Sequence, residues 1–155
     1  MTLHAEIVSL GLTCTIAVAM VTACVLIHYE TLRLASVLMP RLTLRPRKRI
    51  LFVMGAAFVA HSLEVWLCAA GFYVIGNLTS LGGISGNFTG TFYEYLYFST
   101  VSYTSLGIGD LAPTGVLRIL TGVEALVGLA MIAWTGSFTY LAMEKFWSLH
   151  RTSQD

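Results

Sequence analysis

The sequence has 155 residues, of which 56% are hydrophobic and only 11% charged, with a formal net charge of +1 and a mean hydropathy of +0.76. A typical soluble domain has about 45–50% apolar and about 25% charged residues, so an ordinary soluble domain is excluded. Intrinsic disorder is also excluded, because it requires low hydrophobicity and high charge. The composition predicts an integral membrane protein, and the charge pattern gives no indication of binding to nucleic acid.

Residues 7–29 form the first long apolar stretch and contain no Asp, Glu, Lys or Arg. About 20 apolar residues suffice for a membrane-spanning helix. No basic residue precedes this stretch and no clear cleavage site follows it, so we expect a permanent helix within residues 1–30 and not a signal peptide. Residues 30–39 mix apolar and charged side chains and are expected to lie at the membrane surface. Pro40 should stop them, because proline removes a backbone donor and clashes with a continuing helix.

The basic residues predict the orientation of the chain. All but Arg118 lie either in the loop 31–49 or in the tail 144–155. By the positive-inside rule, these two segments face the cytoplasm, and the N-terminus and residues 77–115 lie outside. The prediction is a multi-pass protein of the plasma or inner cell membrane. The segment Arg41–Arg49 is interpreted as a topology anchor, with contact to anionic lipid as the alternative. The basic residues concerned are Arg33, Arg41, Arg45, Arg47, Lys48, Arg49, Lys145 and Arg151.

Two further apolar stretches, residues 50–76 and 116–143, are long enough to span the membrane. Between them, residues 77–90 are rich in Gly, Ser, Asn and Thr and predict an exposed outer loop. The apolar run 92–104 that follows reaches only about 20 Å as a helix. Because the membrane core is about 30 Å thick, this run predicts a re-entrant helix that enters and leaves on one side.

Thr91 and Glu94 have the spacing of a capping box and predict where this short helix begins. The carboxylate of Glu94 also complements the positive end of the helix dipole. The helix is expected to direct its C-terminal end towards the middle of the membrane.

The short helix is followed by Thr-Ser-Leu-Gly-Ile-Gly-Asp at residues 104–110 and then by a full membrane span. This arrangement resembles the pore region of potassium channels, where a pore helix precedes a strand of the Thr-Val-Gly-Tyr-Gly-Asp type. In such a strand the backbone carbonyls replace the hydration shell of the ion. Gly107 and Gly109 have the matching spacing, and glycine reaches positive φ at little cost. The resemblance is strongest over residues 91–143 and looser over 50–76.

Carried over by position, the resemblance implies a selectivity filter for K⁺ at the end of the pore helix, whose last residue is Thr104. Ser105, which stands where the family usually has Thr, would form the innermost ion site with its hydroxyl and carbonyl. The sites above it would use carbonyls, and Gly128 would lie near an inner-helix gating glycine. The implied filter residues are Thr104, Ser105, Leu106, Gly107, Ile108, Gly109 and Asp110, with K⁺ held by Ser105, Leu106, Gly107 and Ile108 and with Asp110 at the outer mouth.

Ile108 departs from the family pattern, which has Tyr or Phe at this position. The ion-binding carbonyl is unaffected, but the aromatic ring that braces the filter against the pore helix is missing. Tyr97, Phe98 and Tyr103 are the candidates to replace this bracing.

The resemblance implies an all-α membrane protein with three transmembrane helices, a re-entrant pore helix and a filter loop. The pore domain covers residues 50–143: an outer helix 50–76, a loop 77–90, a pore helix 91–104, a filter 105–110 and an inner helix 116–143. Because one chain supplies only one pore loop, the resemblance implies a homotetramer in the lipid bilayer.

The expected function is passive, potassium-selective conduction, with no cofactor other than the permeant K⁺. The alternatives are a weakly selective Na⁺/K⁺ channel and a non-conducting membrane assembly subunit. An enzyme is not expected, because no HExxH or Ser/His pair occurs.

Ionisable residues interrupt two of the spans. His61, Glu64 and Cys68 share one helix face, and Glu124 lies four residues before Gly128. Such groups usually face protein or water. The first interpretation is a proton-sensitive or gating network. The second, favoured for His61 and Glu64, is a buried hydrogen-bonded pair that fixes helix register. Bound metal is not expected there, because a third ligand with suitable spacing is missing. For Glu124, which is expected to meet the back of the pore helix, neither interpretation is favoured.

Overall fold

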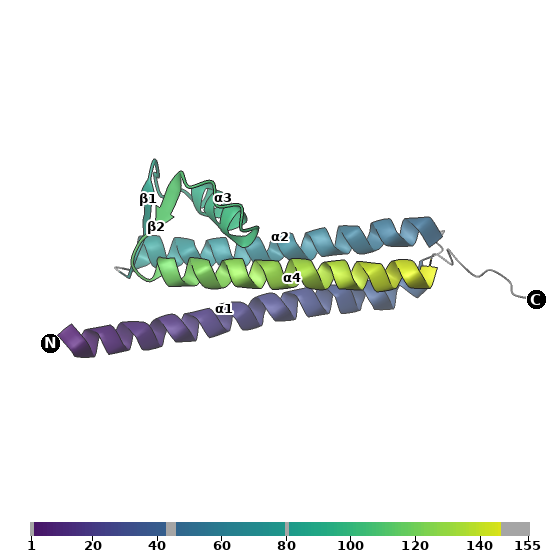
Figure 1. The fold of residues 1–155 in the computed structure, drawn as a ribbon, viewed down its shortest axis with the longest axis horizontal. Coiled ribbons are helices and arrows are strands. Elements are labelled where there is room, and N and C mark those ends of the chain that lie inside the picture. The colour runs from purple at the N-terminus through teal and green to yellow at the C-terminus, as the bar shows by residue number, and fades with distance from the viewer. Residues whose placement is uncertain (1, 43–45, 80, 147–155) are drawn as a thin grey trace, which may run out of the picture.

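In the computed structural model, residues 2–42, 46–79 and 81–146 are described. Among them, three long helices lie side by side: α1 (Thr2–Leu38), α2 (Pro46–Leu78) and α4 (Leu117–Phe146) (Figure 1). Each contains a stretch long and apolar enough to cross a membrane, which confirms the three expected spans. The helix α1 packs against both α2 and α4. The chain has the fold of an all-α, multi-pass membrane protein.

The expectation that residues 30–39 lie at the membrane surface stays a prediction, but these residues do not form a segment separate from the bundle. Residues 30–38 continue α1 without a break and Met39 follows directly, with Leu32, Ala35 and Met39 all buried. Met39 packs with Val53 of α2 and Ala142 of α4. The apolar positions of this segment therefore extend the contact between α1 and the other helices.

The helix α1 ends next to the predicted proline. Leu38 is its last residue, and the short 3-10 helix η1 (Met39–Arg41) contains Pro40 in its first turn. On the exposed face of the same segment, Arg33 and Glu30 form an ion pair at 2.6 Å. Exposed pairs of this kind contribute little to stability, so the buried apolar positions determine the course of the helix.

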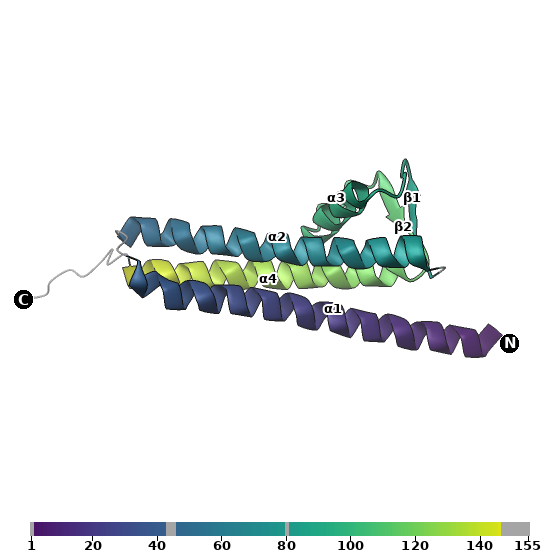
Figure 2. The ribbon, with the colours of Figure 1, turned by 180° about the vertical axis from the view of Figure 1, so that it is seen from behind.

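The short helix α3 (Phe92–Tyr103) lies near one end of the bundle, on the side of α2 and α4 away from α1 (Figures 1 and 2). Its 12 residues are too few to cross a membrane, as expected for a re-entrant helix. Two strands, β1 (Ile84–Gly86) and β2 (Leu111–Pro113), lie at the same end and pair antiparallel. Their register places Ile84 opposite Pro113 and Gly86 opposite Leu111. This pairing joins the outer loop to the segment that follows the expected filter.

Two apolar clusters hold α3 against the bundle. One is near the strands and includes Phe72 of α2, Phe98 of α3 and Leu120 of α4. The other lies deeper and contains Cys24, Cys68, Tyr103, Val127 and Met131. These contacts fix the C-terminal end of α3 between α2 and α4.

The two ends of the bundle differ in charge. The end that carries α3 and the strands also carries the beginning of α1, whereas η1 and the end of α4 lie at the opposite end (Figure 2). Arg41, Lys48 and Arg49 belong to that opposite end, and Arg118 follows β2. Residues 43–45 of the proposed lipid-binding segment, together with Arg151, lie outside the described residues.

Candidate functional site

The helix α3 begins with the predicted capping box, formed by Thr91 and Glu94. The carboxylate of Glu94 accepts hydrogen bonds from the backbone amides of Thr89 and Thr91 and from both threonine hydroxyls, at 2.8 to 3.1 Å. The Thr89 hydroxyl is the largest of the causes that lower the pKa of Glu94 from its ordinary value of 4.5 to about 2. Hydrogen bonds to a carboxylate favour its charged form, so this end of α3 carries a negative charge.

After α3 the backbone alternates in conformation. Ser105, Gly107 and Gly109 have positive φ angles of 56°, 55° and 87°, and the residues between them do not. The amides of Ser105 and Leu106 donate back to carbonyls of α3, at 2.9 and 3.0 Å. Within the described parts of the chain, no backbone amide donates to the carbonyl oxygens of residues 105–108. These carbonyls are free to bind a cation.

The same segment lies on the surface of the single chain. Every residue from Thr104 to Asp110 is exposed, and the apolar side chains of Leu106 and Ile108 are 67% and 58% exposed. Large exposed apolar side chains are expected where a protein meets a partner or a membrane. The filter segment is therefore available for contact with further copies of the chain.

The filter segment has one of the expected aromatic braces. The Tyr97 hydroxyl donates to the Asp110 carboxylate at 2.9 Å, which ties the end of the expected filter segment to α3. Phe98 is buried and lines a cavity of about 170 Å³ between α3, α4 and the filter segment. Tyr103, the third candidate, is buried and bonds to His61 and Glu64 of α2 instead. The cavity is lined by Tyr97, Phe98, Val101, Ser102, Gly107, Gly109, Asp110, Leu111, Pro113 and Thr121.

The back of α3 meets α4 as expected. The Ser99 hydroxyl donates to Glu124 Oε1 at 2.5 Å and lies 2.9 Å from the carbonyl oxygen of Val65. Glu124 is fully buried, and its Oε2 has no partner among the described residues. One buried carboxylate thus connects the middle of α3 to α4.

Gly128 of α4 packs closely against the end of α3. A Cβ atom at this position would overlap the carbonyl oxygen of Tyr103, the last residue of α3. The structure therefore gives Gly128 a packing role. Its predicted role as a gating hinge stays a prediction.

Behind the filter, five side chains from all four helices form one hydrogen-bonded group, here called the buried cluster. Glu64 bonds to Nδ1 of His28 at 3.0 Å and accepts a hydrogen bond from the Tyr103 hydroxyl. His61 Nδ1 lies 2.9 Å from the same hydroxyl. Thr135 Oγ1 lies 3.2 Å from His28 Nε2 and 3.0 Å from His61 Nε2. The cluster joins α1 to the C-terminal end of α3.

The favoured pairing of His61 with Glu64 differs in detail from the structure. These two groups approach to 3.6 Å, which is longer than a hydrogen bond, because Glu64 bonds directly to His28 and Tyr103. His28 was missed in the sequence. The sequence did contain a signal, because His28 is a lone histidine in the apolar stretch 7–29, which has no Asp, Glu, Lys or Arg. Polar groups at such positions usually face a partner within the protein.

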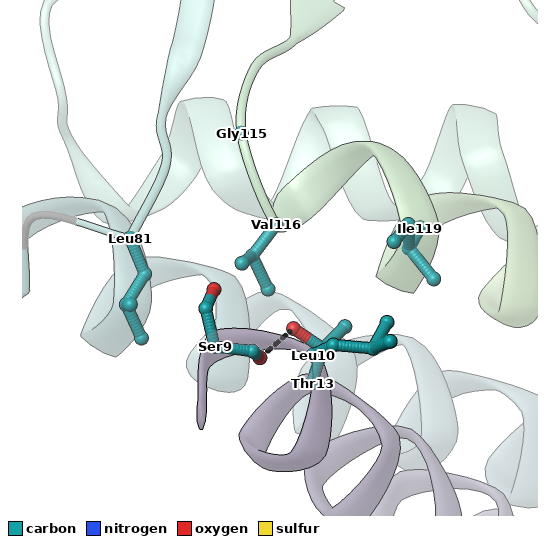
Figure 3. A pocket seen from close by; sticks show the side chains of 7 residues that line it. All are labelled: Ser9, Leu10, Thr13, Leu81, Gly115, Val116 and Ile119. Atoms are coloured by element: carbon teal, nitrogen blue, oxygen red, sulfur yellow. Dashed lines mark hydrogen bonds between the residues drawn. The ribbon is translucent and has the colours of Figure 1, made fainter. Parts of the chain in front are cut away.

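A separate groove lies between the beginning of α1 and the beginning of α4. Figure 3 shows Ser9, Leu10 and Thr13 of α1 facing Val116 and Ile119 across it. The Thr13 hydroxyl donates to the Ser9 carbonyl at 2.7 Å and so is turned back onto its own helix. The groove has a volume of about 480 Å³ and does not include any filter residue. It is lined by Ser9, Leu10, Thr13, Leu81, Gly115, Val116 and Ile119.

The chain therefore has the features of a pore-loop membrane protein: a capped short helix, an exposed segment with free carbonyls after it, and two flanking spans. A family model described as an ion channel matches residues 50–145, which is more than half of the chain and runs from α2 through α4. The chain belongs to this family of pore-loop ion channels. The helix α1 precedes the matched region. No curated protein and no solved structure matches the chain.

Proposed function

We propose that this ion channel is potassium-selective and conducts K⁺ passively down its electrochemical gradient. The observation that carries the proposal is the row of free carbonyls at residues 105–108, in a backbone whose φ is positive at Ser105, Gly107 and Gly109. Rings of backbone carbonyls are the ligands with which K⁺ channels replace the hydration shell of the ion. The hydroxyl of Ser105 adds a further oxygen at the inner end of the row.

The active unit in this proposal is a homotetramer. Four filter strands around one axis would surround each ion with carbonyls, which a single strand does not do. The exposure of residues 104–110 on one chain supports this arrangement, since this segment is accessible to neighbouring copies. Four copies of a 16.9 kDa chain give the mass that native mass spectrometry of the purified protein should find. A stable monomer or dimer would contradict the assembly.

The orientation follows from the charge difference between the two ends. We place the filter, the strands and the N-terminus outside, and the C-terminus in the cytoplasm, because the basic residues at 41, 48 and 49 belong to the end opposite the filter. This end would face the anionic lipid of the inner leaflet, for which the segment 41–49 is the proposed contact.

A weakly selective cation channel is the second candidate function. It is favoured by the exposed Ile108, which leaves the filter without an aromatic at that position, and by the cavity of about 170 Å³ between the filter segment and α3. A less firmly braced filter would coordinate K⁺ and Na⁺ with less discrimination. A non-conducting assembly subunit is the third candidate.

The test is ion flux through the purified protein alone in liposomes, with either K⁺ or Na⁺ as the permeant ion. We expect rapid K⁺ flux and little Na⁺ flux. Equal fluxes would favour the weakly selective channel, and absence of both fluxes would favour the assembly subunit. The variant Gly107→Ala should remove the flux.

A further inference from the structure

The buried cluster contains side chains of the kind that bind metal ions, a property separate from ion conduction. His28, His61 and Glu64 each offer one ligand atom, and these three atoms lie within 4.8 Å of one another. His61 and Glu64 lack a third ligand nearby in the sequence, and His28 of α1, 36 positions before Glu64, supplies it in the fold. Two imidazoles and one carboxylate from two helices therefore converge at one place.

Both imidazoles are oriented for coordination. Their Nδ1 atoms face Glu64, at 3.0 Å for His28 and 3.6 Å for His61. Their Nε2 atoms both face the hydroxyl oxygen of Thr135, at 3.2 and 3.0 Å. A histidine that binds a metal through one ring nitrogen usually places the other against a hydrogen-bond partner, which fixes the ring. Thr135 occupies that position for both rings at once.

The carboxylate is also held in place. The Tyr103 hydroxyl donates to Glu64, and the same oxygen lies 2.9 Å from His61 Nδ1. A metal ion would replace the bonds from Nδ1 of His28 and His61 by coordination bonds. Tyr103 would remain beside the ion, either bonded to the carboxylate or at a fourth position.

The charge of the site is compatible with a cation. The side chains of His28 and Glu64 are fully buried, and the ion-pair partners of Glu64 among the described residues are both histidines. A buried carboxylate needs a compensating positive charge, and a bound metal ion would supply it. His61 is the partly exposed member, with 22% of its side chain accessible, and gives an ion a route into the cluster.

We propose that His28, His61 and Glu64 bind a divalent transition metal of the zinc class, which clamps α1 to the pore domain. Two histidines and one carboxylate are a ligand set that zinc uses with a fourth position open. Calcium and magnesium are poor fits, because they prefer several oxygen ligands and this set offers one carboxylate. The absence of thiolate from the set argues against Cu(I).

The direct test is metal binding by the purified full-length protein in lipid nanodiscs, stripped with a chelator and titrated with Zn²⁺ alone. We expect saturable binding of one ion per chain, and X-ray absorption at the zinc edge should show two imidazole ligands. His28→Ala and Glu64→Gln should abolish this binding. The wild-type protein alone can overturn the proposal. It does so if it does not bind Zn²⁺ saturably, or if its bound zinc shows no imidazole scattering.

Two further variants keep the test specific. Thr135→Val preserves the shape of the side chain and removes only the contact to both rings, so the affinity should fall by about 10–100-fold. Cys24→Ser is the matched control, because Cys24 is buried and lies 3.9 Å from Cys68 Sγ, outside the proposed set. The assignment is contradicted if the affinity for Zn²⁺ is unchanged in Thr135→Val or lost in Cys24→Ser. None of these readouts involves conduction, so they remain decisive if the potassium proposal fails.

Discussion

At the scale of single residues, the proposed filter depends on backbone conformation more than on side chains. Gly107 and Gly109 take positive φ angles at no steric cost, whereas Ser105 is the one non-glycine residue among those described with a positive φ. A residue with a side chain in this region carries strain of about 1–3 kcal/mol. Such strain persists where the surroundings fix the backbone, and the bonds from this segment to α3 carbonyls are that constraint.

Gly107→Ala is expected to abolish or strongly reduce conduction while the chain still folds and assembles. A Cβ atom at Gly107 has no neighbour within 4 Å, so the cost comes from its φ of +55°, about 1–2 kcal/mol for an L-residue. Gly71→Ala in α2 is the control, because its Cβ also has no neighbour and its φ is not positive. Single-channel recording provides the measurement. Unchanged single-channel current in Gly107→Ala would count against the filter assignment.

Glu94 should stay ionised far into the acid range. Its pKa is lowered to about 2, so its contribution to folding is present above the ordinary carboxyl pKa near 4.5 and is lost as the pH falls through about 2. Infrared titration of isotope-labelled Glu94 should find this low midpoint. Thr89→Val removes the hydroxyl donor and should move the midpoint upwards. A wild-type midpoint near 4.5 would show that the capping network does not form in solution.

At the scale of elements, the re-entrant helix α3 is held by a few specific contacts on its buried face. Its middle is tied to α4 through Ser99 and Glu124, and its end packs on Gly128 and the buried cluster. These contacts determine how closely the filter base approaches α4.

Ser99→Ala should destabilise the protein by about 1–3 kcal/mol, because the buried carboxylate of Glu124 loses the partner of its Oε1 atom. Ser62→Ala is the control, since Ser62 is exposed and its hydroxyl donates to the Phe58 carbonyl within its own helix. Denaturant unfolding in detergent gives the comparison. Equal unfolding midpoints for the two variants would contradict the structural role of Ser99.

Gly128→Ala tests packing against hinge motion. A methyl group there would overlap the Tyr103 carbonyl, so we expect a less stable protein in which the end of α3 is displaced. Gly136→Ala, also in α4, meets nothing within 4 Å and should be tolerated. Thermal unfolding of the two variants measures the difference. A Gly128→Ala protein of normal stability whose opening alone is altered would favour the hinge.

Much of the element order could be predicted from the sequence, because the signals are local. The long apolar runs predicted α1, α2 and α4, Pro40 marked the end of α1, and Thr91 with Glu94 marked the beginning of α3. The strands β1 and β2 are three residues each and form only through their pairing, so no local pattern predicts them. The course of residues 30–39 depended on Met39 contacting α2 and α4, which is likewise a tertiary effect.

The candidate site likewise has one part that the sequence predicts and one part that depends on tertiary contacts. The filter residues stay a prediction, which was possible because their order in one short segment resembles a known pattern. The buried cluster could not, since His28, Glu64, Tyr103 and Thr135 come from four helices and meet only after folding. A sequence pattern places residues on a helix face, but it does not show which face of α1 meets α2.

At the scale of the whole molecule, the chain is an ion channel with one helix more than the matched family region. In our proposal, the exposed filter segment meets neighbouring subunits. The helix α1 lies on the side of the bundle away from α3, yet it reaches the filter base through His28 and the buried cluster. Exposed apolar side chains along the long helices are available to lipid and to neighbouring subunits. Conduction by the assembled protein is therefore the property on which the interpretation depends.

The most direct test of potassium selectivity is the reversal potential of current through the purified channel, with K⁺ on one side of a bilayer and Na⁺ on the other. If the carbonyls of residues 105–108 form the filter, the reversal potential should lie far from zero, in the direction that K⁺ selectivity requires. A reversal potential near zero, which means a permeability ratio near one, would contradict potassium selectivity.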